Sequence, residues 1–397
     1  AIEQNYSKDE ILAMYLNSVY YGENSFGIGD AAKTYFGKAP KDLTLAESAM
    51  LIGILPAPSA YSPISGSEIY AKQRQTTVLS RMVTNGYITE AQKTAALAEV
   101  LTYAKTADTP DSIAPHFVEM VINELSDKYG YEKVMRSGFQ VKTTLDLDAQ
   151  TALNESIASG MPHINANGGS NASGVVIDSK TGEIRALAGS ADYMNDKWGK
   201  VNMVTTARQP GSSFKPIYYS NALADGVITP ATIINDEKTD FGGGYVPNNA
   251  DHKFRGDVTV RKALDWSLNI PAIKIMQKYG VAKSVTAANN LGLGLDTKKD
   301  YDLTLALGSS EVPLLKMTNA YAAFANQGSL HNTNIIKQVS DKYDKKMQSS
   351  ASTTKQAISK EGAYLISNIL ADNATRAVIF GSSLTVRGYT VAVKTGT

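Results

Sequence analysis

A serine and a lysine three positions apart, Ser212 and Lys215, are the residues of this sequence best placed to do chemistry. A proline and a glycine precede them and predict the start of a helix, whose spacing would put Lys215 over Ser212 on one face. A serine hydroxyl becomes a nucleophile when a base takes its proton, and a buried lysine with a lowered pKa is such a base. The alternative is an N-cap serine followed by a surface lysine. The same spacing recurs at Ser352 and Lys355 in a polar loop.

A second pair of polar residues, Ser267 and Asn269, begins 55 positions after Ser212. Pro271 disfavours helical backbone at Ile270, so the pattern predicts that one helix ends here and another begins. A hydroxyl and an amide at such a turn could relay a proton and hydrogen-bond a substrate amide. Taken alone, this spacing is more typical of an ordinary helix C-terminus.

A third set follows an apolar run that predicts a strand over residues 389–393, and consists of Lys394, Thr395, Gly396 and Thr397. A lysine and hydroxyls at a strand end can bind a carboxylate, and a glycine there lets a substrate backbone lie close to the strand. The same three letters, K-T-G, occur at 180–182. There they fall in a predicted hairpin turn, which explains them without a site.

Hydrophobic patterns along the chain predict the elements that must position these residues. Ser7 and Thr44 each open a capping box before an apolar stripe, which predicts helices in the first 90 residues. Short helices and a strand at 139–145 are expected next. Apolar residues then alternate at 175–177 and 184–187 on either side of a turn, which predicts a hairpin. Five helical stretches follow, at 214–223, 260–268, 271–279, 314–325 and 362–371.

The composition favours a folded chain with at least one sizeable core and excludes several kinds of site. The 397 residues carry 39 Lys and Arg against 38 Asp and Glu, a formal net charge of +1, so no overall basic field favours a nucleic acid or an anionic membrane. The absence of cysteine excludes thiolate nucleophiles, disulfides and cysteine zinc sites. With only four histidines, a histidine-rich metal site is not expected.

The three candidate sets occur in the order S-x-x-K, S-x-N and K-T-G, a combination far more specific than any single set and typical of penicillin-recognising serine enzymes. Through the three sets and the residues that flank them, the C-terminal two thirds resembles the transpeptidase domain of class A, bifunctional penicillin-binding proteins. The resemblance is carried by 208–216, 264–271, 305–309 and 320–328. The first helices are similar to the end of a peptidoglycan glycosyltransferase domain, through 8–17 and 74–79, although Gln75 departs from the family motif.

The resemblance implies a role for each candidate residue. Ser212 would attack the penultimate D-Ala carbonyl of a peptidoglycan stem peptide, with Lys215 as general base. Ser267 would pass a proton to the leaving amine, and Asn269 would hold the substrate amide. The substrate carboxylate would bind at the last set, made of Lys394, Thr395, Gly396 and Thr397. The backbone N–H groups of Ser212 and Thr397 would form the oxyanion hole, β-lactams would acylate the same serine, and neither a metal nor an organic cofactor is implied.

The same resemblance implies an α/β (α+β) fold, with a central antiparallel sheet flanked by helices plus an all-helical subdomain. We expect a glycosyltransferase remnant at 1–90, an interdomain linker at 91–169 and the transpeptidase domain at 170–397. The family's last strands and terminal helix would follow Thr397. Its catalytic glutamates and membrane anchor would precede Ala1, so glycosyl transfer is not expected of this chain. Its expected location is the extracytoplasmic face of the bacterial cytoplasmic membrane. The expected partners are stem peptides, β-lactams and cell-wall synthesis proteins, without nucleic acid.

Two other kinds of protein share the three sets. A DD-carboxypeptidase or serine β-lactamase must admit a hydrolytic water, and the E-x-x-L-N element of class A β-lactamases is missing between Ser267 and Lys394. A non-catalytic penicillin sensor would use acylation as a signal. The glycosyltransferase-like motifs argue against a sensor, because they place the domain in a bifunctional synthase.

Overall fold

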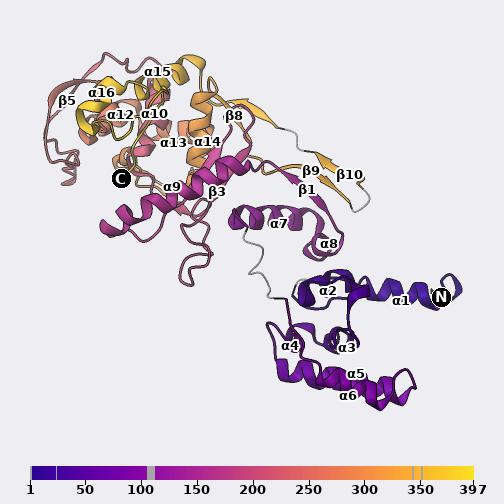
Figure 1. Ribbon diagram of the computed structural model, residues 1–397. Coiled ribbons are helices and arrows are strands. Elements are labelled where there is room, and N and C mark those ends of the chain that lie inside the picture. Colours follow the sequence, from indigo (N-terminus) through magenta and orange to yellow (C-terminus); the bar gives the residue numbers. More distant parts are fainter. Residues whose placement is uncertain (1, 24, 105–111, 342–343, 350–351) are drawn as a thin grey trace. The chain divides into compact units, whose positions relative to one another are not determined.

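The computed structural model describes residues 2–23, 25–104, 112–341, 344–349 and 352–397. The chain forms two compact units (Figure 1). The N-terminal unit comprises Ala1–Ser112 and Glu132–Arg136, and the C-terminal unit comprises Ile113–Tyr131 and Ser137–Thr397. The expected three-part division at residues 90 and 169 stays a prediction.

Helices make up the N-terminal unit, as the patterns predict. Ser7 caps α1 and Thr44 caps α3, and both capping boxes are formed, with Glu10 and Glu47 reaching back to the cap backbone. The α-helices of this unit are α1 (Lys8–Leu16), α2 (Ile28–Phe36), α3 (Leu45–Ile54), α4 (Pro58–Tyr61), α5 (Glu68–Thr84), α6 (Glu90–Ala98) and α8 (Tyr131–Arg136). Single 3-10 turns lie at η1 (Ile2–Gln4) and η2 (Pro40–Asp42).

The core of the N-terminal unit lies between α2, α3 and α5. Tyr35, Met50 and Leu51 are fully buried there, and the Tyr35 hydroxyl donates a 2.8 Å hydrogen bond to the Tyr21 carbonyl oxygen. Helix α1 contributes no buried residue to this core.

The C-terminal unit mixes helices with short antiparallel strands. Its α-helices are α7 (Pro115–Tyr129), α9 (Leu147–Ala166), α10 (Lys215–Ala224), α11 (Val260–Asp265), α12 (Asn269–Tyr279), α13 (Val281–Asn290), α14 (Leu314–Ala325), α15 (Lys360–Leu370) and α16 (Asn373–Phe380). Its 3-10 turns are η3 (Gly211–Phe214) and η4 (Leu303–Leu307). The strands are β1 (Gln140–Thr143), β2 (Gly174–Ile177), β3 (Ile184–Ala188), β4 (Ala207–Arg208), β5 (Ile233–Asp236), β6 (Gly256–Thr259), β7 (Val312–Pro313), β8 (Ser329–His331), β9 (Ile336–Ser340), β10 (Lys346–Ser349) and β11 (Thr354–Gln356).

All named strands pair in antiparallel fashion. The sheet β1-β9-β10 has three strands, and the other pairs are β2-β3, β4-β7, β5-β6 and β8-β11. The predicted hairpin at 175–187 is confirmed as β2-β3, with 180–182 in its turn. This combination of antiparallel strands and a large helical core is the expected mixed α/β fold.

Helix α10 is the centre of the main core. It packs against α12, α13 and α15, and these helices lie together in Figure 1. Phe214 just before it and Ile217, Tyr218 and Tyr219 within it are fully buried. Because Lys215 is the first residue of this helix, its side chain enters the protein interior at the edge of that core.

Two expectations about local structure are wrong. Residues 389–393 are not a strand. Their segment is largely exposed, and its backbone bonds join the Tyr389 N–H to the Val386 carbonyl oxygen at 3.1 Å and the Val393 N–H to the Leu370 carbonyl oxygen at 3.0 Å. An apolar alternating run forms a strand only when a neighbouring strand accepts its hydrogen bonds. The region 147–166 is one long helix, α9, packed on β3, where only short helices were expected.

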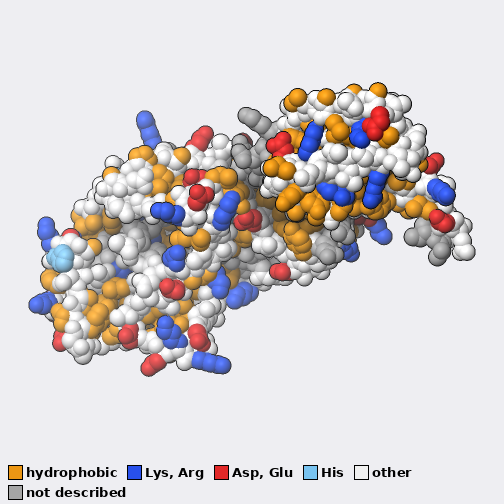
Figure 2. All heavy atoms as spheres, turned by 90° about the horizontal axis from the view of Figure 1, so that it is seen from below, with side chains coloured by type: hydrophobic (Ala, Val, Ile, Leu, Met, Phe, Trp, Pro, Cys, Tyr) orange, Lys and Arg blue, Asp and Glu red, His pale blue; other side chains and the backbone are white. Residues whose placement is uncertain are grey.

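Charged side chains of both signs are interspersed over the face in Figure 2, in keeping with the net charge of +1. Within the described ranges, no helix combines the length and the apolar character needed to cross a membrane.

Candidate active site

The serine of the first candidate set lies on a 3-10 turn that leads into α10. Gly211 opens this turn with a φ of 56°, a conformation that side chains rarely adopt, and a Cβ there would overlap the carbonyl oxygen of Thr397. The turn therefore brings the backbone of Ser212 against the K-T-G segment. Ser212 is half-buried, whereas Lys215, three residues on, is 0% exposed.

The second set lies at the junction of α11 and α12, as predicted, although Pro271 does not cause the break. Ile270 is helical, and Pro271 lies in the first turn of α12, where a missing N–H costs no intrahelical bond. The chain reverses instead at Ser267, whose φ of 58° is left-handed. As a result, the Ser267 carbonyl oxygen accepts a hydrogen bond from Lys215, and the Ser267 hydroxyl oxygen accepts one from Lys394.

Lys215 meets the second set through all three of its donor positions. Its Nζ lies 2.8 Å from the Ser267 carbonyl oxygen, 3.1 Å from the Leu268 carbonyl oxygen and 2.8 Å from Asn269 Oδ1. All three acceptors are neutral oxygen atoms, so Lys215 has no carboxylate among these partners.

Lys394 joins the third set to the second. Its Nζ donates to the Ser267 hydroxyl oxygen at 2.8 Å, to the Thr395 carbonyl oxygen at 2.8 Å and to Thr395 Oγ1 at 3.3 Å. The three sets, which span residues 212 to 397, thus meet in one place.

Most of these residues, though neither lysine, line a pocket of about 540 Å³. Its polar lining includes Ser212, Ser267, Asn269 and Thr395, and Gly396 and Thr397 also line it. Trp266, Leu307 and Phe380 supply apolar walls. The pocket thus presents several hydroxyls and an amide, with the buried Lys215 and the half-buried Lys394 beside it.

Burial lowers the pKa of both lysines beside this pocket and so favours the neutral amine; a like charge adds to the effect at Lys215. Burial lowers the pKa of Lys215 well below its ordinary value, and the nearby Lys394 lowers it further. Burial lowers the pKa of Lys394 to about 7, opposed by Asp265. Burial, followed by the nearby Asp372, raises the pKa of the Asp265 carboxyl to about 8.

The decoy motifs lie elsewhere. Lys180 falls in the β2-β3 turn, and the Ser352 hydroxyl contacts the His331 ring at 2.8 Å rather than Lys355, which lies in β11. Across the described part of the chain, no group of three His, Asp or Glu side chains is arranged to hold a metal ion.

Three residues that hold the site were not anticipated from the sequence. Asn249 Oδ1 accepts the Asn269 backbone N–H at 2.7 Å, and the Asn248 carbonyl oxygen accepts Asn269 Nδ2 at 2.7 Å. Asp236 in turn holds Asn249. The run P-N-N at 247–249 has the composition of a turn, and nothing in its pattern tells that one of its asparagines is buried.

Family models match most of the chain. The penicillin binding protein transpeptidase domain matches residues 172–397, and the transglycosylase model matches residues 1–83. The chain is 33% identical over 380 residues to penicillin-binding protein 1F of Bacillus subtilis, covering 93% of this chain and 51% of that protein. It is 29% identical to penicillin-binding protein 1A of Neisseria gonorrhoeae, covering 100% of this chain and 63% of the relative. The chain thus spans about half to two thirds of the length of these relatives.

Solved structures share the fold. Penicillin-binding protein 1A from Haemophilus influenzae superposes with a TM-score of 0.71 at 24% identity, over 97% of this chain and 74% of that one. The PonA1 protein from Mycobacterium tuberculosis in complex with penicillin V gives 0.57 at 21% identity, over 66% and 72%. The matched transpeptidase model covers more than half of the chain, and the transglycosylase model precedes it. The chain therefore belongs to the class A, bifunctional penicillin-binding proteins.

Proposed function

We propose that this chain carries a serine DD-transpeptidase site that cross-links peptidoglycan through an acyl-enzyme at Ser212. The observation that carries the proposal is the hydrogen-bonded series Asn269, Lys215, Ser267 and Lys394 beside the pocket that Ser212 lines. Family membership supports peptidoglycan transpeptidation as the general activity.

In the acylation step, Ser212 Oγ attacks the carbonyl carbon of the penultimate D-Ala, and its proton passes to Lys215 Nζ. Lys215 must be neutral for this step, and its burial favours that state. A neutral amine donates only two hydrogen bonds, so one of its three acceptors is released and the lone pair is freed for the proton. The backbone N–H groups of Ser212 and Thr397 stabilise the oxyanion.

The C–N bond then breaks, and the leaving D-Ala amine takes a proton through the Ser267 hydroxyl, which Lys394 holds. The Asn269 amide binds the substrate amide, while Lys394, Thr395 and Thr397 bind the terminal carboxylate. An amine from a second stem peptide attacks the ester, forms the cross-link and returns the proton to Ser212. A β-lactam acylates the same serine and has no leaving group that departs.

We infer that the wider setting is the extracytoplasmic face of the bacterial cytoplasmic membrane, where stem peptides and cell-wall synthesis proteins are available. We do not assign glycosyl transfer to residues 1–83. In this segment Glu10 and Glu47 are engaged in capping boxes, and Glu47 also pairs with Lys38 at 2.7 Å.

The test is intact-protein mass spectrometry after incubation with benzylpenicillin. We expect a single persistent adduct that is absent from Ser212→Ala and present in Ser352→Ala, the matched serine of the second S-x-x-K. A transient adduct would indicate a serine β-lactamase instead. A folded wild-type protein that forms no adduct would refute the proposal.

A further inference from the structure

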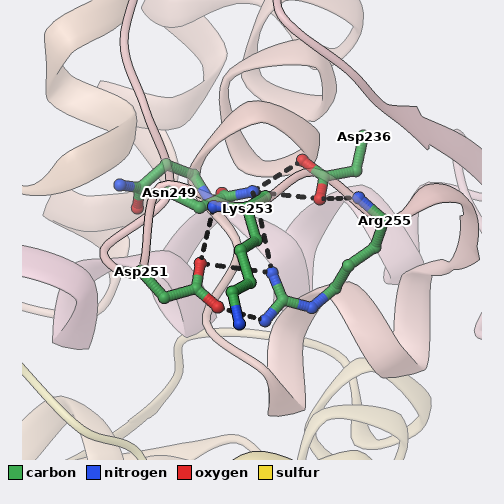
Figure 3. A network of polar contacts seen from close by, with 6 residues as sticks. Asp236, Asn249, Asp251, Lys253 and Arg255 are labelled. Carbon is green, nitrogen blue, oxygen red and sulfur yellow. Dashed lines mark hydrogen bonds and ion pairs between the residues drawn. The ribbon is translucent and has the colours of Figure 1, made fainter.

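The loop between β5 and β6 is anchored by a buried carboxylate. Asp236, the last residue of β5, is 0% exposed. Its Oδ1 and Oδ2 accept Asn249 Nδ2 at 2.9 Å and 3.0 Å, and its Oδ2 also accepts the Arg255 backbone N–H at 3.0 Å (Figure 3). A buried charge is tolerated only when hydrogen bonds of this kind compensate it, so Asp236 fixes the position of the Asn249 side chain.

The opposite end of the same amide points to the candidate active site. Asn249 is 3% exposed, and its Nδ2 also donates to the Lys253 carbonyl oxygen at 2.8 Å. With Nδ2 occupied in this way, Oδ1 faces the first turn of α12 and accepts the Asn269 N–H at 2.7 Å. An exchange of the oxygen and nitrogen of Asn249 would put acceptor against acceptor at the Asp236 end and donor against donor at the Asn269 end.

The loop also sets which end of the Asn269 side chain faces Lys215. The Asn248 carbonyl oxygen accepts Asn269 Nδ2 at 2.7 Å, which leaves Asn269 Oδ1 directed to Lys215 Nζ at 2.8 Å. If the amide were reversed, its NH₂ group would face the amine and its oxygen would face a carbonyl, and both contacts would be lost.

We propose that Asn249, held by the buried carboxylate of Asp236, is a positioning residue for acylation: it fixes the Asn269 amide and, through it, the Lys215 amine. This inference rests on the proposed function. Asn249 acts through Asn269, although it also lines the pocket. The ion pair between Arg255 and Asp251 at 2.6 Å, with 43% of the Asp251 side chain exposed, lies on the outer part of the same loop.

The test measures the acylation rate constant and its pH profile separately from the fraction of protein that can be acylated. Misfolding lowers the fraction, whereas a displaced Lys215 lowers the rate constant of the folded molecules. Asn249→Ala should reduce the rate constant about 10- to 100-fold, as expected when a buried hydrogen-bond network loses one partner. Asp236→Asn should act in the same direction by a smaller factor, because one oxygen can still accept a bond.

The pH profile gives a readout that a purely structural role would not move. A hydrogen bond from the Lys215 ammonium to Asn269 Oδ1 favours the charged form, so its loss lowers the pKa of Lys215 further. The rising limb of the acylation profile should therefore move to lower pH in both variants. Matched controls in the same hairpin are Asn235→Ala and Asp257→Ala, which break the 2.9 Å bond between those two side chains and should leave both readouts unchanged.

The possible results separate a failure of this inference from a failure of the proposed function. A wild-type rate constant and an unmoved limb in Asn249→Ala would overturn the inference while leaving the proposed function intact. If Asn249→Ala does not fold, the rate constant and limb of Asp236→Asn decide in its place. A folded wild-type protein without an adduct would refute the proposed function instead.

Discussion

The motif residues of the two units differ in their burial and in how distant their contacts are. In the N-terminal unit, the family-like segment 8–17 is one continuous helix with no buried residue, and Leu12 and Tyr15 are 55% and 54% exposed. In the C-terminal unit, the three sets are far apart in sequence; the second contacts Lys215, which is 0% exposed, and the third joins it through Lys394 and Ser267. A motif becomes a site when several elements meet at it, as they do around Ser267 in the C-terminal unit.

Glu47 of the N-terminal unit illustrates the same difference. Glu47 is buried, but it is bonded to the Thr44 backbone and to Lys38, both at its own end of α3. Lys215, by contrast, contacts residues more than 50 positions away. The partners of Glu47 stabilise its own helix, whereas those of Lys215 join segments that are far apart in the sequence.

Replacing Lys215 by Ala should have the largest effect. Without the buried amine to take the Ser212 proton, the benzylpenicillin acylation rate constant should fall about 10²- to 10⁴-fold. Stopped-flow fluorescence with a labelled penicillin measures it. Lys355→Ala, the lysine of the second S-x-x-K, is the matched control. A Lys215→Ala rate within threefold of wild type would mean that convergence at this lysine is not what makes the site.

Shortening a buried side chain of the N-terminal core should destabilise that unit and leave acylation at the C-terminal site unchanged. Leu51 is 0% exposed among apolar neighbours, so Leu51→Ala should cost about 2–5 kcal/mol in the free energy of unfolding of that unit. Chemical denaturation followed by circular dichroism measures the loss. The acylation rate constant should not change, and a parallel drop in acylation would show that the C-terminal site depends on the N-terminal unit.

The pH dependence should reflect the two lysines with opposite signs. Acylation should rise with pH as Lys215 loses its proton, and fall as pH passes about 7, where Lys394 loses the charge that binds the substrate carboxylate. At one pH unit above the pKa of Lys394, about a tenfold loss from the charged form is expected. Lys394→Arg, which stays protonated, should remove the falling limb; if the limb persists, another group causes it.

The smallest effect is expected at the exposed capping box. Ser7→Ala removes the side-chain acceptor of the Glu10 backbone N–H and should cost about 1 kcal/mol of local helix stability. Hydrogen exchange of the α1 amides should detect it, and Ser7→Asn should restore protection. Any effect on acylation would contradict the local character of this unit.

Much of the architecture was predictable because its causes are local. Ser7 and Thr44 mark helix starts by their own hydrogen bonds, and the 175–187 hairpin follows from alternation around a turn. The strand expected at 389–393 failed because strand formation depends on a partner that the segment itself does not encode.

The candidate site was predictable in its members and not in its supports. Ser212, Ser267 and Asn269 could be assigned by resemblance, and the structure places them around one pocket. Asn249 and Asp236 could not be assigned, because the burial of a loop amide depends on tertiary packing and leaves no period or spacing in the sequence. For the same reason, the left-handed backbone at Ser267 was not anticipated.

That left-handed residue narrows the amino acids that can replace it. A φ of 58° is accessible to Gly, Asn and Asp, none of which carries a hydroxyl, while threonine carries one but is β-branched and disfavoured in that region. Almost no other amino acid therefore both adopts this backbone conformation and carries a hydroxyl. Under the proposed function, few single changes at position 267 therefore keep both the backbone conformation and the hydroxyl.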